Sequence, residues 1–213
     1  ETFTARYTHE TIALAFSITE EAVEDNLYDS IAKRYTKALA RSMAQTKQIK
    51  AANILNNAFA TTTYGDGQFL IDSDHPTVAA GNQSNLLAAS DLNETSLEAS
   101  LIAIGKFQDE RGFKIAARGM KLIIPSDLQF VAERLTKTAN RVGTADNDIN
   151  AVQSMGMMPQ GFVVNNFLTD TNAFFIKTDV PNGLKHFQRA ALKTAMEGDF
   201  DTGNMRYKAR ERY

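Results

Sequence analysis

The sequence of 213 residues has no cysteine, only four prolines and only three histidines. The absence of cysteine excludes disulfides, thiolate nucleophiles and cysteine-based zinc or iron–sulfur sites, and it is typical of a chain made in a reducing compartment. No apolar run approaches the ~20 residues that span a bilayer, so we expect no membrane segment. The first residues, Glu1-Thr2-Phe3-Thr4, lack an initiator methionine and a signal-peptide pattern, which predicts a processed or trimmed chain.

Motifs that carry catalysis are also missing. The histidines at positions 9, 75 and 186 form no pair at metal-ligand spacing on a helix. No serine lies in a nucleophile elbow, no phosphate-binding loop ends in lysine, and no dinucleotide-binding glycine fingerprint follows a strand. We therefore predict a protein that is not an enzyme, with no catalytic residues, no cofactor and no bound metal.

What is present is the composition of a globular protein. Hydrophobic residues make up 43% of the chain, charged residues 23%, and the net charge is -2. These values disfavour disordered, collagen-like and strongly basic nucleic-acid-binding proteins. The length allows one sizeable core or two small ones.

The first elements are a strand and a long helix. Side chains alternate over residues 3–18, which predicts a hairpin or one long bent strand. From Thr19 the spacing becomes helical, and the absence of glycine and proline before Gly65 allows a helix over about residues 19–59. Such a helix would be roughly 60 Å long, whereas a compact chain of this length is about 44 Å across. We therefore expect a flat or elongated molecule that completes its burial on other chains.

The rest of the chain mixes short helices and strands without regular alternation. A turn-rich segment covers residues 61–93, and a helix follows from about residue 97 and stops at Gly112. Strands are predicted at residues 113–116 and 121–124, a helix at 126–135 and a helical piece at 149–155. Residues 161–168 and 173–178 are predicted to form a hairpin, and residues 184–193 and 204–213 to form two closing strands. This order indicates an α+β fold.

One acidic loop is a candidate metal site. Hard oxygen ligands and one imidazole could hold a divalent cation at Asp66, Asp72, Asp74 and His75. The alternative is that these residues only form turns, since Asp and Ser favour turns and His75 precedes a proline that requires extended backbone.

The C-terminal segment predicts a row of cations. Strand alternation places Arg206, Lys208, Arg210 and Arg212 on one face. Like charges on one strand face repel each other and need water or an acidic partner. The row is therefore either a solvated face or a salt-bridging seam. The candidate partners of a seam, in the same chain or in a neighbouring copy, are the acids at the start of the predicted long helix, Glu20, Glu21, Glu24, Asp25 and Asp29. Direct nucleic-acid binding is a third alternative, and the net charge of -2 and the absence of a broader basic patch weigh against it.

Three sequence blocks resemble the head proteins of tailed bacteriophages in type and in order. They are AFSITEE at residues 15–21, GDGQFL at residues 65–70 followed by Asp74-His75-Pro76, and NGLKHFQR at residues 182–189. On these blocks the chain is similar to a major capsid protein of the Hong Kong 97-type fold.

The resemblance implies an α+β capsid fold with a long spine helix, peripheral and axial domains, and a partial extended loop. Residues 1–18 would be the returning strand of the extended loop, and residues 19–92 the peripheral domain with the spine helix at about 19–59. Residues 93–183 would form the axial domain, and residues 184–213 the return strands of the peripheral domain. Because family members carry an N-terminal arm and an outgoing loop strand, we expect the chain to begin inside that loop and to stop in mid-strand at Tyr213.

The function implied by the resemblance is structural. Copies would self-assemble as pentamers and hexamers into the icosahedral head of a tailed phage, enclosing double-stranded DNA; the head would assemble in the host cytoplasm and become part of the virion. Portal, scaffold and decoration proteins are the further partners that the family implies, and the near-neutral charge favours weak contact with DNA. The alternatives are an encapsulin-like compartment shell, a metal-dependent hydrolase using Asp66, Asp72, Asp74 and His75, and a plain soluble binding domain, which would be a monomer.

Overall fold

The protein forms two compact units. The computed structural model describes residues 3–4, 6–25, 28–60, 63–141 and 148–213. Unit 1 comprises Glu1–Ala5 and Ala52–Gly183, and unit 2 comprises Arg6–Ala51 and Leu184–Tyr213. Each unit contains its own three-stranded sheet together with helical segments, which confirms the α+β class. No helix in the described part of the chain has both the length and the hydropathy to cross a membrane.

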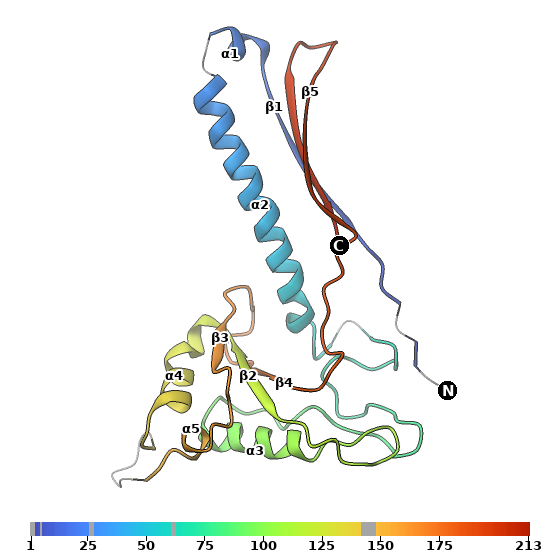
Figure 1. Cartoon of the computed structure of the whole chain (residues 1–213), viewed down its shortest axis with the longest axis vertical. Helices are drawn as coiled ribbons and strands as arrows, with labels where there is room; N and C mark the ends of the chain where they lie inside the picture. The colour runs from blue at the N-terminus through green and yellow to red at the C-terminus, as the bar shows by residue number, and fades with distance from the viewer. Residues whose placement is uncertain (1–2, 5, 26–27, 61–62, 142–147) are drawn as a thin grey trace. The chain divides into compact units, whose positions relative to one another are not determined.

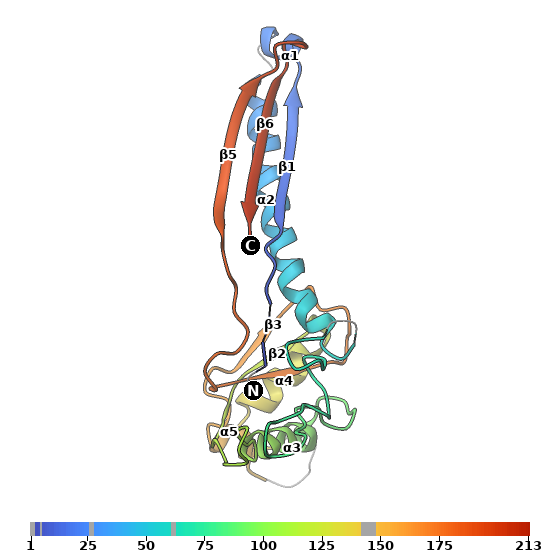
Figure 2. The same cartoon turned by 90° about the vertical axis from the view of Figure 1, so that its right-hand side faces the viewer.

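Unit 2 is a helix on an antiparallel sheet. Its strands are β1 (Thr11–Ile18), β5 (Ala190–Gly198) and β6 (Met205–Arg212), in the spatial order β1-β6-β5. The helices are α1 (Glu20–Glu24) and α2 (Tyr28–Asn56), of which α2 continues into unit 1 at its C-terminal end. Figures 1 and 2 show that α2 runs along one face of the sheet.

A small apolar cluster holds α2 to the sheet. Leu39 and Met43, one helical turn apart, pack on Ala209 of β6, with Ile12 and Phe16 of β1 beside them. The Phe16 ring lies between two others: its centroid is 4.9 Å from that of Tyr207 and 5.6 Å from that of Tyr35. These contacts confirm the predicted alternation of β1, because every second side chain faces α2.

The N-terminal strand is shorter than the sequence predicts. β1 begins at Thr11 instead of at residue 3, and Thr11 is paired with Arg212 near the end of β6. Beyond this point, among the residues that the structure describes, the pairing consists of two backbone hydrogen bonds between Glu10 and Tyr213, at 2.9 and 3.2 Å. Alternation alone does not make a strand, because a strand lasts only as long as its hydrogen-bonding partner.

The prediction of one helix over residues 19–59 is wrong. α1 ends after five residues, where the Asp25 N–H donates to the carbonyls of Glu21 and Val23, and α2 begins at Tyr28. The closely spaced like charges of Glu20, Glu21, Glu24 and Asp25 disfavour the continuation of α1, and Asp25, which caps it, is a poor helix former. α2 ends at Asn56, whose side chain binds the backbone of Phe167 and Thr169. Its 29 residues span about 44 Å, so helix length alone does not require the helix to outgrow a compact body.

Unit 1 is built on a mixed sheet of order β3-β2-β4. The strands are β2 (Gly119–Ile124), β3 (Phe162–Val164) and β4 (Phe175–Thr178), and β2 pairs parallel to β3 and antiparallel to β4. The helical elements are α3 (Glu94–Gly105), the short 3-10 helix η1 (Ser126–Leu128), α4 (Gln129–Lys137) and α5 (Ala151–Ser154). α3 starts with a capping box formed by Asn93 and Ser96.

The core of unit 1 lies between this sheet and its helices. Fully buried side chains include Leu97 of α3 and Leu122 and Ile124 of β2. Glycine at the start of β2 leaves room for the core, because a Cβ on Gly119 would lie 2.6 Å from Cδ2 of Leu101 and would have to displace it.

Three predictions for this unit are corrected. Residues 161–168 and 173–178 do not form a hairpin, because β2 inserts between β3 and β4. The helix predicted to stop at Gly112 ends at Gly105, and Gly112 instead occupies a turn with φ of 88°. The strand predicted at residues 113–116 is reduced to a single bridge between Gln108 and Lys114, since no long strand lies beside it.

We predict that Leu97→Ala lowers the free energy of unfolding by about 2–5 kcal/mol, because it leaves a cavity in the core of unit 1. Leu97 is 0% exposed, whereas Ile102 on the same helix is 59% exposed. Ile102→Ala is therefore the matched control, with an expected change of less than about 0.5 kcal/mol. Urea unfolding measures both, and similar losses in the two variants would contradict this description of the core.

Candidate assembly interface

The face of the unit 2 sheet opposite to α2 is basic. The β6 side chains alternate as predicted, with Tyr207, Ala209 and Glu211 facing α2 and the cations on the other face. Register places Lys193 of β5 beside Arg210, and therefore on the same face. We call this surface the basic sheet face and define it by Lys193, Arg206, Lys208, Arg210 and Arg212.

Most neighbours of these cations on the sheet are small or like-charged, and the exception is Glu197 of β5, which is paired with Arg206. On the β1 side the register pairs Thr11, Ala13, Ala15 and Ser17 with the four β6 cations. Arg206 is neutralised by Asp199, at 2.5 Å between Nη2 and Oδ2. Lys208 and Arg210 are exposed and have no acidic partner among the described residues. Directly opposed like charges such as Lys193 and Arg210 are destabilising, so this face favours an anionic partner.

The predicted acidic partners lie at one end of the same unit. Thr19 caps α1, its hydroxyl accepting from the Ala22 N–H at 3.4 Å. The Glu20 carboxylate lies over Gly203 in the turn between β5 and β6. We call Glu20, Glu21, Glu24 and Asp25 the acidic segment. No ion pair joins it to the β6 cations within the described part of the chain.

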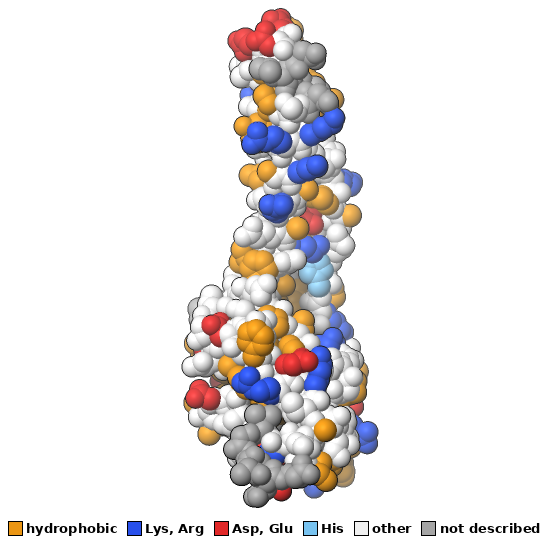
Figure 3. Space-filling model, turned by 90° about the vertical axis from the view of Figure 1, so that its left-hand side faces the viewer, with side chains coloured by type: hydrophobic (Ala, Val, Ile, Leu, Met, Phe, Trp, Pro, Cys, Tyr) orange, Lys and Arg blue, Asp and Glu red, His pale blue; other side chains and the backbone are white. Residues whose placement is uncertain are grey.

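A second basic surface, on α2, was not singled out from the sequence. Two α2 cations face the sheet: Lys47 lies 3.6 Å from Glu211, and Lys50 binds Glu10. Helical spacing places Arg34, Lys37 and Arg41 on the side away from the sheet, and all three are exposed. We call these three residues the basic stripe. Figure 3 shows Lys and Arg side chains spaced along this side of unit 2 and a group of acids at its α1 end.

The local charge distribution of the sequence indicates the basic stripe, although the net charge of the whole chain does not. No Asp or Glu occurs between Ser30 and Asn56. Unit 2 has fourteen Lys and Arg residues against ten Asp and Glu, whereas unit 1 has nine against fifteen. The net charge of -2 is therefore the sum of an acidic unit and a basic one.

Apolar side chains are also exposed on unit 2. Met196 of β5 is 56% exposed and Phe200, in the following turn, is 102% exposed. Met196 pairs with Tyr207 and thus lies on the α2 side of the sheet, yet α2 does not cover it. Figure 2 shows α2 behind β1 and β6, with β5 at the free edge.

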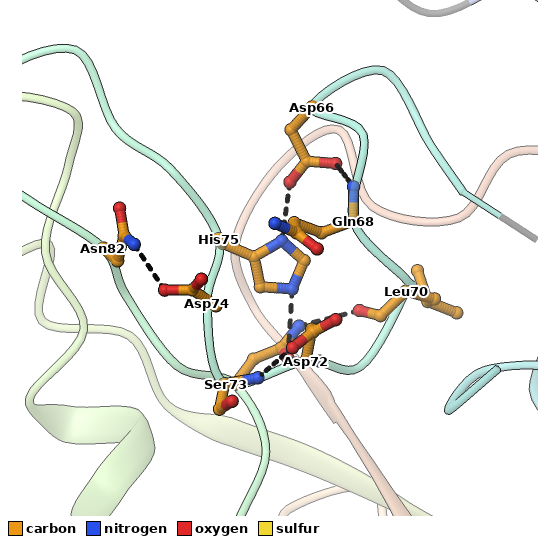
Figure 4. Close-up of polar contacts among 9 residues, drawn as sticks. Asp66, Gln68, Leu70, Asp72, Ser73, Asp74, His75 and Asn82 are labelled. Atoms are coloured by element: carbon orange, nitrogen blue, oxygen red, sulfur yellow. Dashed lines mark hydrogen bonds and ion pairs between the residues drawn. The ribbon is translucent and has the colours of Figure 1, made fainter.

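The candidate metal loop is organised around His75. Nδ1 of His75 donates to Asp66 Oδ2 at 2.6 Å, and Nε2 lies 3.3 Å from Asn85 Oδ1 (Figure 4). Burial on its own would raise the pKa of the Asp66 carboxyl, but hydrogen bonds from His75 and from the Gln68 N–H lower it below its ordinary value of 3.8.

The remaining two acids do not join this pair. Asp72 accepts from the Ser73 N–H at 2.6 Å, and Asp74 points to Asn82, whose side chain donates to it (Figure 4). Within the ranges that the structure describes, no three His, Cys, Asp or Glu side chains are placed to hold a metal ion. These hydrogen bonds stabilise turns, as the alternative interpretation of the loop predicts. The geometry therefore gives no support to a metal-dependent hydrolase.

The described residues of unit 1 also line a shallow hollow of about 420 Å³, next to the start of α3. Its wall includes the ion pair between Arg141 Nε and Glu94 Oε2, at 2.6 Å. That pairing raises the pKa of the Arg141 guanidinium, which remains a cation and offers no acid–base chemistry.

The fold is that of a phage capsid subunit. The structure is similar to the capsid of bacteriophage JBD30, with a TM-score of 0.60 and 12% sequence identity, over 78% of this chain and 77% of that one. It also matches a structure from Mycobacterium phage Che8, with a TM-score of 0.47 and 15% identity, over 95% of this chain and 65% of that one. A comparison with curated protein sequences finds no match.

The sequence itself identifies the family. The sequence pattern of the family described as phage capsid protein matches residues 2–213, and the chain belongs to this family. It is therefore a structural protein of a phage head, a component of the virion that assembles with other subunits into a shell. The resemblance drawn from the three sequence blocks is confirmed, and neither the compartment shell nor the hydrolase finds support.

We predict that Asp66→Asn destabilises unit 1 at neutral pH. Because the folded pKa of Asp66 is lowered, the ionised carboxylate stabilises the fold above about pH 3.8, and this contribution is lost as the pH falls through the folded value. The stability difference between wild type and variant should therefore shrink as the pH is lowered from about 7 to about 3 in urea unfolding.

The control for this prediction is Asp74→Asn, which alters a carboxyl of the same loop that does not contact His75. It should change stability less at neutral pH. A difference for Asp66→Asn that is constant over the whole pH range would show that the charge of Asp66 does not contribute.

Proposed function

We propose that this protein is the major, wall-forming subunit of an icosahedral tailed-phage head that encloses double-stranded DNA, and that it carries no catalytic activity. Copies would form pentamers and hexamers that close into the shell. The proposal extends the family membership from a capsid protein in general to the subunit that makes the continuous wall.

The observation that carries the proposal is the incomplete cover of unit 2. Among its described residues, the apolar cluster has Leu39, Met43 and Ala209 as buried members, with Ile12 and Phe16 beside them. Among the residues of unit 2 that the structure describes, no further strand pairs with either edge of the sheet and no helix covers its basic face, and β5 is exposed along most of its length. Small units with so little burial are marginally stable alone, and contacts with neighbouring copies would complete their cores.

We further propose the Hong Kong 97-type arrangement for these elements. In it α2 is the spine helix, and it forms the peripheral domain together with β5 and β6. Residues before α1 are the returning strand of the extended loop, and residues 93–183 form the axial domain. The predicted domain limits stay a prediction, and the contacts favour moving the boundary from residue 92 into α2, since residues 52–92 group with unit 1.

The acidic segment and the basic sheet face are the surfaces that we propose to meet between copies. They carry opposite charges, and no ion pair joins them within one copy among the described residues. The acidic segment lies at one end of the sheet, whereas the β6 cations extend from that end over about 20 Å. A head-to-tail contact would bring the acids of one copy onto the cations of the next. Repeated heterologous contacts of this kind close into rings.

The sheet face suits a protein partner. Alanines at positions 13, 15 and 195 lie between the cations in register, so the surface is flat and partly apolar. A short helix such as α1 could approach it closely, and the mixed contact would bury apolar area along with the charge pairs. Portal, scaffold and decoration proteins would bind the assembled shell at surfaces that we do not assign.

We predict that reversing either charged surface blocks assembly and that reversing both restores it. Glu21→Lys with Glu24→Lys, or Lys208→Glu with Arg210→Glu, should lower the yield of particles at least about tenfold, because like charges then face each other. The combined fourfold variant should assemble again. Sedimentation and negative-stain electron microscopy measure the yield.

The control for the charge reversal is Glu110→Lys, which changes an exposed acid of unit 1 and should assemble like wild type. Circular dichroism checks that each variant is folded. If the fourfold variant assembles no better than the two double variants, the two surfaces are not partners.

A further inference from the structure

The basic stripe of α2 has a different chemistry from the basic sheet face. Arg34, Lys37 and Arg41 lie on the side of α2 opposite to the sheet and have no acidic partner among the described residues. The same side continues with the exposed amides Gln45 and Gln48. The stripe is therefore a row of cations followed by neutral hydrogen-bond donors.

Large apolar side chains are missing from this side of the helix. The residues between the stripe members and the amides are Ala38 and Ala44, both exposed. Protein interfaces usually place aromatic or large aliphatic anchors at their centre, and this surface offers none. A convex row of cations with small neutral spacers instead suits a polyanion that is itself regular, and phosphate contacts require no apolar anchor.

The spacing of the stripe fits a nucleic-acid backbone. Along the helix axis Arg34 and Lys37 are about 4.5 Å apart, and Lys37 and Arg41 about 6 Å apart. Phosphates of one DNA strand advance about 3.4 Å per nucleotide. Three cations over about 10 Å therefore face about three phosphates, while the glutamine amides can donate to further phosphate oxygens.

We propose that the α2 face carrying Arg34, Lys37 and Arg41 binds the phosphate backbone of the enclosed double-stranded DNA, without reading its sequence. The inference rests on the proposed function, since a shell that encloses DNA presents one of its surfaces to it. Each copy makes only a few contacts, so the affinity per subunit is low and strongly salt-dependent. Many copies in a shell then act together on one long polyanion.

The first experiment measures binding of unassembled protein to a fluorescent duplex of about 30 base pairs over a range of salt concentrations. The triple variant Arg34→Gln, Lys37→Gln, Arg41→Gln should bind at least about tenfold more weakly at low salt, with a salt slope smaller by about 2.7. The variant Arg34→Lys with Arg41→Lys keeps the charges and should bind like wild type. Unchanged binding by the triple variant overturns the proposal.

The second experiment places a photo-crosslinking side chain in DNA-filled particles. Position 45 tests the stripe, because Gln45 is neutral, exposed and next to Arg41 on the same side. Position 195 is the control, since Ala195 pairs with Lys208 on the basic sheet face. We expect position 45 to label DNA and position 195 to label another copy of the chain. Labelling of protein from position 45, or of DNA from position 195 alone, overturns the proposal.

The two experiments separate this inference from the proposed function. If wild-type protein forms no closed particles, the proposed function fails, and the duplex titration still decides the role of the stripe. If particles form but the triple variant cannot assemble, the α2 face is a contact between proteins and the inference is wrong. If the triple variant assembles normally and loses DNA affinity, both proposals are supported.

Discussion

One constraint underlies the architecture of unit 2: a three-stranded sheet has two faces and two edges, and a single helix can cover only one face. Leu39 and Met43 of α2 supply that cover for β1 and β6. β5 is left exposed, with Met196 uncovered even on the helix side. Exposed edge strands and apolar side chains are aggregation hazards in a monomer, and they become useful only when other copies cover them.

The charged side chains of unit 2 are also distributed unevenly over its surfaces. The acids of unit 2 are concentrated near α1 and the turn between β5 and β6, while the cations occupy the length of α2 and β6. Lys47, which faces the sheet, is paired with Glu211, and Arg206 is paired with Asp199, whereas Lys208 and Arg210 have no acidic partner among the described residues. The two outward basic surfaces both carry alanines but differ in shape: the strand face is flat, whereas the helix face is convex and continues with the exposed amides Gln45 and Gln48. We therefore assign them different partners.

The sequence was sufficient where a signal was local. Alternation in β6 predicted its cation face, and the order of three sequence blocks pointed to the capsid family. Features that depend on pairing between distant strands were not predicted. β1 begins where its partner β6 ends, and β2 lies between β3 and β4, which were predicted to form a hairpin. The break after Asp25 was missed because the apolar spacing of the long helix continues on both sides of it. For the candidate metal loop, the sequence correctly placed Asp66 near His75. It did not predict that the Asp74 carboxylate is bound by the side chain of Asn82 instead. The basic stripe was not predicted, because the net charge of -2 sums the basic residues of unit 2 with the acids of unit 1.

Backbone hydrogen exchange in β5 tests most directly whether unit 2 is completed by other copies. The rates in unassembled protein and in assembled particles are compared, with the buried strand β2 of unit 1 as an internal reference. We predict that β5 exchanges rapidly in unassembled protein and at least about tenfold more slowly in particles, while β2 is protected in both. Equal protection of β5 in the two states would contradict the account, because unit 2 would then need no neighbour.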